Sequence, residues 1–183
     1  MVLSGGVPKL VLIAEFTSDY EKEAYEKSRL AEKGIKNFNL RTKVTKTSEE
    51  AEKYWVIRRE SFNLLRKNVH GLHTAPFIDD LIVKPRQLPE FLPKLYSILD
   101  EYKIIYTIAG HAGDANFHII PLMDLHKTES RKIITELAER VYNLVFQFKG
   151  SISGEHNDGL IRTPFLEKMY GPEVYKLFEE TKK

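Results

Sequence analysis

The sequence predicts an α+β fold, a ferredoxin-like sandwich expected in doubled form, with helices packed on a mixed or antiparallel sheet. Segments of strand character alternate along the chain with segments of helical periodicity. The strand-like segments at residues 103–108 and 116–122 are joined by too few residues for a helical crossover, which favours an antiparallel pair. With 183 residues, 42% of them hydrophobic and 30% charged, the chain suits one globular domain over residues 1–183.

The first predicted elements are a strand and a helix. Residues 9–17 (KLVLIAEFT) are apolar, rich in branched side chains and too few for a helix, so they indicate a buried strand. Ser18 followed by Glu21 forms a capping-box pattern, and a run of helix formers continues from there. Gly34 is expected to end this helix.

The same order recurs in the next segment. Residues 38–44 alternate in polarity and indicate a second strand, after which Thr47 and Glu50 form a second capping box that opens a helix. Residues 70–76 contain two histidines, a glycine and a proline. This composition predicts an irregular loop that leads into a strand at residues 80–83.

The second half contains the clearest helix. Residues 88–102 carry apolar side chains at helical spacing, which predicts a helix. Residues 103–108 and 116–122 predict two strands, as above. Residues 128–148 place their apolar side chains on one face and are followed by Gly150, so they predict a long helix with a defined end.

Composition and charge exclude several classes of protein. The formal net charge is +2 with lysine and glutamate interleaved, so no basic stripe predicts a nucleic-acid partner. The chain has no cysteine, which excludes disulfides and leaves nitrogen and oxygen as the only metal ligands. No apolar stretch suits a leader peptide or a transmembrane segment, and a cytoplasmic location is therefore expected.

Polar side chains concentrate in two glycine-bearing segments, AGHAGDANFH at residues 109–118 and SGEHNDG at residues 153–159. His111 and His118 are seven residues apart, a spacing that puts them on opposite faces of a straight strand. They can converge only if the chain turns between them. Residues 112–116 (AGDAN) have the composition of such a turn, so a two-histidine clamp is feasible.

A carboxylate would complete a three-ligand metal site that leaves a position open for substrate. Glu155 is the nearest candidate, and His156 beside it would remain free for proton transfer. Asp79 and Asp80 could suggest acid and base catalysis, but their position at a strand entry predicts a structural or solvated role. The other histidines are expected at the surface.

Four sequence motifs resemble the C-terminal domain of the FAD-linked oxidases, the family that includes D-lactate dehydrogenase, glycolate oxidase and D-2-hydroxyglutarate dehydrogenase. HAGDANFH at residues 111–118 is similar to the family pattern H-x-G-D-G-N-x-H, and GEHNDG at residues 154–159 to G-E-H-G-x-G. YWVIRRES at residues 54–61 resembles a tryptophan-x-x-arginine helix of the family, and DDLIVKP at residues 79–85 its aspartate-initiated strand. The resemblance covers essentially the whole chain.

The resemblance implies a substrate- and metal-binding domain of an enzyme that oxidises a D-2-hydroxy acid of the D-lactate or glycolate class. By position it implies that His111, His118 and Glu155 hold a divalent metal, Zn, Mn or Fe. It also implies that Asn116 and His156 face the substrate and that Arg58 pairs with the substrate carboxylate. An imidazole so placed can take a proton near neutral pH, which makes His156 the candidate catalytic base. Ala115 and Asn157 stand where the family patterns have glycine. If Ala115 needs a positive φ, it costs on the order of 1 kcal/mol.

The resemblance also implies partners. FAD would be held mainly by an N-terminal FAD-binding domain or subunit, which this chain is expected to lack, and a further electron-transfer partner could reoxidise the flavin. The chain alone is then expected to be inactive and to bind FAD weakly.

Two other functions fit the same residues. A metal-dependent hydrolase could use the His, His and Glu set with a metal-bound water. A non-catalytic ferredoxin-like binding module could carry the histidines as structural residues. Composition does not decide among these functions, and the paired motifs favour the oxidase.

Overall fold

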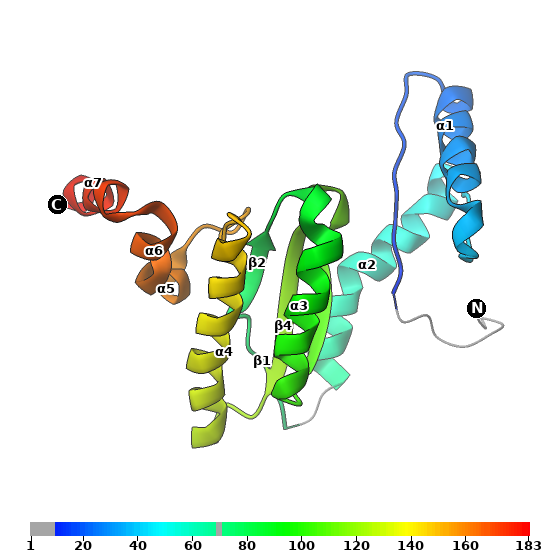
Figure 1. Ribbon diagram of the computed structural model, residues 1–183. Coiled ribbons are helices and arrows are strands. Elements are labelled where there is room, and N and C mark those ends of the chain that lie inside the picture. Colours follow the sequence, from blue (N-terminus) through cyan, green and yellow to red (C-terminus); the bar gives the residue numbers. More distant parts are fainter. Residues whose placement is uncertain (1–9, 69–70) are drawn as a thin grey trace. The chain divides into compact units, whose positions relative to one another are not determined.

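The computed structural model describes residues 10–68 and 71–183, except for the side chains of residue 62 and residues 64–68 (Figure 1). The chain divides into two units, Met1–Lys67 and Asn68–Lys183. Lys9, the first residue of the first predicted strand, and His70, the first of the predicted loop, lie outside the described residues. Within the described residues, no helix combines the length and apolar character needed to cross a bilayer.

The first unit contains the two predicted helices, α1 at Glu21–Gly34 and α2 at Ser48–Asn68, with a short 3-10 turn, η1, at Lys36–Phe38 between them. The capping box of α2 is confirmed in part, because the Thr47 hydroxyl accepts the backbone N–H of Glu50 at 3.2 Å. The capping box predicted for α1 from Ser18 and Glu21 was wrong, because the N-cap of α1 is Tyr20, whose side chain makes no capping hydrogen bond.

The two strands predicted for this unit are not formed. Residues 10–17 and 39–44 carry no strand pairing, and the apolar side chains at the start of the first segment are exposed, including Leu10, Val11 and Leu12 at 68, 63 and 69%. A strand needs a partner for its backbone hydrogen bonds, and the described residues of the first unit supply none to these segments. Local composition therefore did not suffice to predict strand formation in these two segments.

The second unit confirms the α+β prediction. Its four strands are antiparallel: β1 at His73–Thr74, β2 at Ile78–Ile82, β3 at Ile105–His111 and β4 at Asn116–Met123. β4 is the centre, since β3 pairs along one edge while β2 and β1 share the other. One sheet forms in residues 10–68 and 71–183, so the expected doubling is not found there.

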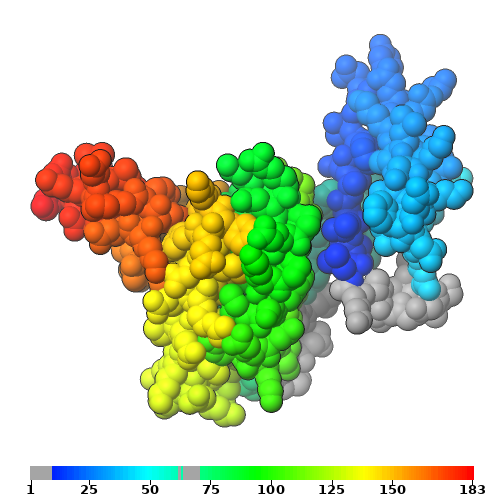
Figure 2. Space-filling model, viewed as in Figure 1, coloured from blue at the N-terminus to red at the C-terminus, as the bar shows by residue number. Residues whose placement is uncertain are grey.

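Two long helices, α3 at Leu88–Glu101 and α4 at Thr128–Gln147, cover one face of this sheet (Figure 1). The two helices lie side by side, as the green and yellow segments in Figure 2 show. Both agree with the predicted helices to within one residue at either end. The remaining helical segments are short or terminal: η2 at Pro85–Gln87, η3 at Ala112–Asp114, α5 at Gly159–Arg162, η4 at Thr163–Phe165, α6 at Leu166–Tyr170 and α7 at Pro172–Lys182.

The core lies between the sheet and these two helices. Fully buried apolar side chains come from α3, α4 and the strands, among them Phe91, Leu95, Leu99, Leu137, Val141, Val145, Ile78, Leu81 and Ile119. Along β4, Phe117, Ile119 and Met123 pack with this cluster. Because successive residues of a strand face opposite ways, Asn116 and His118 lie on the other face.

Tyr142 of α4 ties the core to the loop before β2. Its side chain is fully buried and packs edge-on against Phe165, with the two ring centroids 4.8 Å apart. Its hydroxyl donates a hydrogen bond to the carbonyl oxygen of Phe77 at 2.5 Å. Burial raises the pKa of Tyr142 to about 12, so the phenol stays protonated and remains a donor at neutral pH.

Replacing Tyr142 with phenylalanine should therefore lower the free energy of unfolding by about 1–3 kcal/mol, because the Phe77 carbonyl loses this donor in a buried site. Urea unfolding followed by circular dichroism measures the change. Tyr96→Phe on the exposed side of α3 is the matched control and should change stability by less than about 0.5 kcal/mol. Equal stabilities of the two variants would contradict the role given to the hydroxyl.

Candidate active site

The hairpin of β3 and β4 brings His111 and His118 together. β3 ends at His111, the chain reverses through η3, and β4 starts at Asn116, which is opposite His111 in the register. His118, two residues beyond Asn116, therefore lies on the same face as His111, and the two ring centroids are 5.9 Å apart. The predicted turn is confirmed, and it resolves the unfavourable spacing of the two histidines.

Two residues of this hairpin have backbone constraints. Ala115, which closes the turn, has φ 56° and is fully buried, so the strain of roughly 1 kcal/mol expected at this position is present. Gly110 has φ 148°, and a Cβ there would lie 2.2 Å from the carbonyl oxygen of Asn116. Only glycine fits this point of β3.

Asp80 holds the second glycine-bearing segment against the sheet. Its carboxylate is fully buried and accepts the backbone N–H groups of Glu155 and His156, each at 2.9 Å to Oδ2. Its Oδ1 also accepts the amide of Asn116 at 2.9 Å. A Cβ on Gly154 would lie 2.5 Å from that amide, so a larger residue at this position would have to displace the buried side chain of Asn116. The predicted structural role of Asp80 is confirmed.

The turn directs Glu155 toward the two histidines of the hairpin. Glu155 Oε1 lies 3.0 Å from His118 Nε2 and 3.3 Å from His111 Nε2. One ligand atom from each of these residues lies within 4.8 Å of the others, as a shared metal ion requires. The three residues named from the sequence as metal ligands are thus brought together, although they come from two distant segments.

His156 and Asn116 border this cluster. His156 Nε2 lies 3.5 Å from Glu155 Oε1, and nearly half of the His156 side chain is exposed. Asn116 is buried, and its Oδ1 has no hydrogen-bond partner among the residues that the structure describes. A cavity of about 220 Å³ opens beside the cluster and is lined by Ile82, His111, Asp114, Asn116, Gly154 and Glu155. A small polar molecule could occupy this space.

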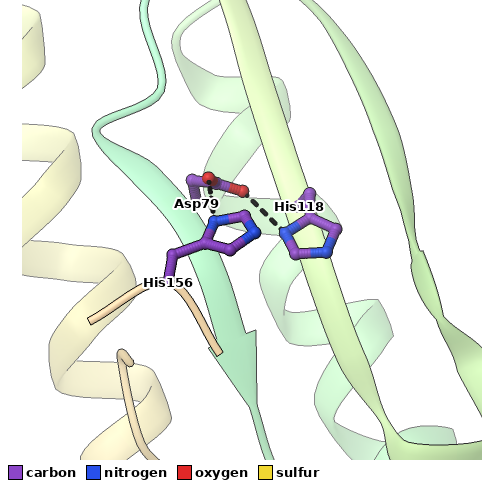
Figure 3. A group of neighbouring side chains, drawn as sticks. All are labelled: Asp79, His118 and His156. Carbon is purple, nitrogen blue, oxygen red and sulfur yellow. Dashed lines mark hydrogen bonds and ion pairs between the residues drawn. The ribbon is translucent and has the colours of Figure 1, made fainter. Parts of the chain in front are cut away.

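Asp79 is the residue that the sequence analysis did not assign to the site. Its carboxylate is mostly buried, with Oδ1 2.9 Å from His118 Nδ1 and Oδ2 3.1 Å from His156 Nδ1 (Figure 3). Burial opposes its ionisation, but the hydrogen bonds to the two imidazoles outweigh that and hold the pKa of Asp79 below its ordinary value. The same contact is the largest cause of the raised pKa of His118.

The sequence showed the adjacent pair Asp79 and Asp80, but it did not show that both side chains would reach the same turn. Two adjacent aspartates on a regular strand would face opposite ways, but the register of β2 shifts between Ile78 and Leu81, and Asp80 has φ 66°. Both carboxylates therefore reach the segment at Gly154 to His156. The irregularity depends on pairing with β4 and could not be inferred from the sequence.

The remaining predicted residues have mixed outcomes. Arg58 is exposed on α2 in the first unit, and its pairing with a substrate carboxylate stays a prediction. Asn157 has φ 62°, which asparagine tolerates better than most residues. His73 and His126 are exposed, as expected for histidines outside the site.

The chain is similar to several dehydrogenases and to a subunit of an oxidase. D-2-hydroxyglutarate dehydrogenase of Haemophilus influenzae is 27% identical over 124 residues, which cover 68% of this chain and 12% of that protein. The mitochondrial cytochrome D-lactate dehydrogenase of Arabidopsis thaliana is 29% identical over 135 residues, 74% of this chain and 24% of that protein. Glycolate oxidase subunit GlcD of Bacillus subtilis is 23% identical over 159 residues, 87% of this chain and 33% of that protein.

The chain thus spans a third or less of the length of these relatives. The sequence pattern of the family described as FAD linked oxidases, C-terminal domain, matches residues 7–183. This match includes both glycine-bearing segments and the strand that carries Asp79 and Asp80. The chain therefore belongs to the family of FAD linked oxidases, C-terminal domain.

Proposed function

We propose that this chain is the substrate- and metal-binding part of a flavin-dependent enzyme that oxidises a D-2-hydroxy acid of the D-lactate or glycolate class. The observation that carries the proposal is the convergence of His111, His118 and Glu155 beside the exposed imidazole of His156. The names of the similar enzymes refer to 2-hydroxyglutarate, lactate and glycolate, which share a hydroxyl group next to a carboxylate. The common part of these substrates is what the cluster would bind.

His111, His118 and Glu155 would hold a divalent metal such as Zn, Mn or Fe. The fit rests on their donors, because two imidazole nitrogens and one carboxylate oxygen form a three-ligand set that leaves space for substrate oxygens. The other ring nitrogen of His118, Nδ1, lies 2.9 Å from the carboxylate of Asp79, and metal-bound histidines commonly donate a hydrogen bond to a carboxylate in this way. When bound, such an ion acidifies the substrate hydroxyl and fixes the carbon that is oxidised.

The side chains around the ligands would act on the substrate directly. His156 would accept the hydroxyl proton at its exposed imidazole as hydride passes to the flavin. Asn116 lines the cavity and would help to orient the substrate. Arg58 would supply a two-point contact to the carboxylate, a geometry that suits guanidinium.

The flavin would be bound mainly by an N-terminal domain or a separate subunit, and a further protein could accept its electrons. The chain would work in the cytoplasm. Family membership supports this function over a metal-dependent hydrolase or a binding module. Hydrolysis of a test ester by the chain loaded with Zn²⁺ and free of flavin would favour the hydrolase instead.

Removing the glutamate ligand tests the metal site. Glu155→Gln is expected to weaken Zn²⁺ binding by the chain by more than about 100-fold, since even residues that only support a ligand contribute roughly 10–100-fold. Competition with a chromophoric chelator measures the affinity. Asp114→Asn, which removes an exposed carboxylate from the same cavity, is the matched control and should bind Zn²⁺ like the original chain. The metal site is wrong if Glu155→Gln matches this control, or if the original chain binds none of Zn²⁺, Mn²⁺ and Fe²⁺.

A further inference from the structure

Asp79 is placed so that one carboxylate serves two histidines with different proposed roles. Oδ1 faces Nδ1 of His118, a proposed metal ligand, and Oδ2 faces Nδ1 of His156, the proposed base (Figure 3). The two rings are stacked, with centroids 4.7 Å apart and planes 11° from parallel. Each oxygen is thus used by a different ring.

An ionised carboxylate only accepts hydrogen bonds, so each Nδ1 in contact with Asp79 must carry the hydrogen. In a neutral imidazole the other nitrogen, Nε2, is then left with its lone pair. Both Nε2 atoms point toward Glu155 Oε1, at 3.0 Å from His118 and 3.5 Å from His156. Glu155 therefore competes with Asp79 for the single hydrogen of each neutral ring. Asp79 is mostly buried and Glu155 is nearly half exposed, so Asp79 is the stronger acceptor, and Nε2 keeps its lone pair for a metal or a proton.

We propose that Asp79 is a positioning residue that sets the Nδ1–H tautomer of both His118 and His156. His118 can then ligate through Nε2, and His156 can accept a proton at Nε2. The inference rests on the proposed function for the roles of the two imidazoles. The tautomers themselves depend on the contacts of the two rings with Asp79 at Nδ1 and with Glu155 at Nε2.

Asp79 is itself fixed in place. Arg162 is buried and donates through one terminal nitrogen to the backbone carbonyl of Asp79 at 3.1 Å, and through the other to the carbonyl of Asn157. The strand that carries Asp79 and the turn that carries His156 are therefore held by the same guanidinium. This limits the freedom of the carboxylate to leave either ring.

Replacing Asp79 by asparagine gives a specific expectation. An amide has one accepting oxygen and one donating nitrogen, so it can serve the Nδ1–H form of only one ring. The other ring should change to the Nε2–H tautomer, in which Nδ1 accepts the amide hydrogen. Zn²⁺ affinity should fall on the order of 10–100-fold, the usual effect of losing a residue that supports a ligand.

The test is nitrogen-15 NMR of the histidine side chains in the 183-residue chain without metal or flavin, in alkaline solution. We expect Nδ1–H signals for His118 and His156 in the original chain, and one change of tautomer in Asp79→Asn. Asp114→Asn is the matched control and should leave all tautomers unchanged. Asp79→Glu, which keeps two accepting oxygens, should retain the Nδ1–H form at both rings if it reaches them.

Either of two results would overturn the proposal: an Nε2–H signal for either ring in the original chain, or unchanged tautomers in a folded Asp79→Asn. If that variant does not fold, the spectrum of the original chain still decides. Failure of the original chain to bind Zn²⁺ would count against the proposed function and would leave the tautomer result intact. The two ideas therefore fail separately.

Discussion

Replacing His156 by alanine is expected to lower kcat for D-lactate or glycolate by a factor on the order of 10²–10⁴, the usual contribution of a positioned proton acceptor. The measurement needs the chain joined to its flavin-binding domain or subunit, with flavin reduction followed under single-turnover conditions. The imidazole of His156 is half exposed and its main polar contact is with Asp79, whereas the backbone N–H that binds the turn to Asp80 remains in the variant. The fold should therefore survive the change, and the loss should lie in the chemical step.

The matched control for this experiment is His126→Ala. His126 is exposed and its ring contacts only His73 among the aromatic side chains described. Its removal should leave kcat unchanged. Turnover by His156→Ala at the rate of the His126→Ala protein would show that another group takes the proton, and the assignment of the base would have to be abandoned.

The second large effect is expected at Asp80, where asparagine should destabilise the fold by roughly 3 kcal/mol. Three N–H groups converge on the carboxylate, from the backbone of Glu155 and His156 and from the side chain of Asn116. An amide offers one accepting oxygen, so at least one buried donor would face an N–H group. Hydrogen bonds to a charged acceptor contribute about 1.5–3 kcal/mol each, and an unsatisfied buried group adds to the loss.

The pH dependence of stability gives a second readout at this residue. Burial opposes ionisation of Asp80, but the hydrogen bonds from His156, Asn116 and Glu155 outweigh it and hold its pKa below the ordinary value. Because the folded pKa is below the unfolded value of about 3.9, the contribution of Asp80 is present above that pH. It is lost as the pH falls through the folded pKa.

Unfolding by urea at a series of pH values measures both effects. Asp80→Asn should start lower in stability at neutral pH and should lose less than the original chain as the solution becomes acidic. Asp100→Asn, at an exposed position of α3, is the control and should follow the original curve to within about 0.5 kcal/mol. Parallel curves for Asp80→Asn and the original chain would show that this carboxylate is not the one that titrates.

The sequence by itself determined four of the helices and the residues that gather at the candidate site. α3 and α4 formed where the apolar periodicity placed them, because helix hydrogen bonds join residues four apart and are encoded locally. His111, His118, Glu155 and His156 were found from two short motifs, since a chemical site requires particular side chains, which can be recognised in the sequence.

The tertiary structure decided which strands pair and which contacts Asp79 and Asp80 make. The strands predicted at residues 9–17 and 38–44 were wrong among the described residues, because the hydrogen bonds of a strand depend on a partner elsewhere in the chain. Asp79 and Asp80 are adjacent and chemically identical, yet one contacts two imidazoles and the other holds a turn. The register shift of β2 against β4 allows both side chains to reach the same turn, and such a shift exists only once the sheet has formed.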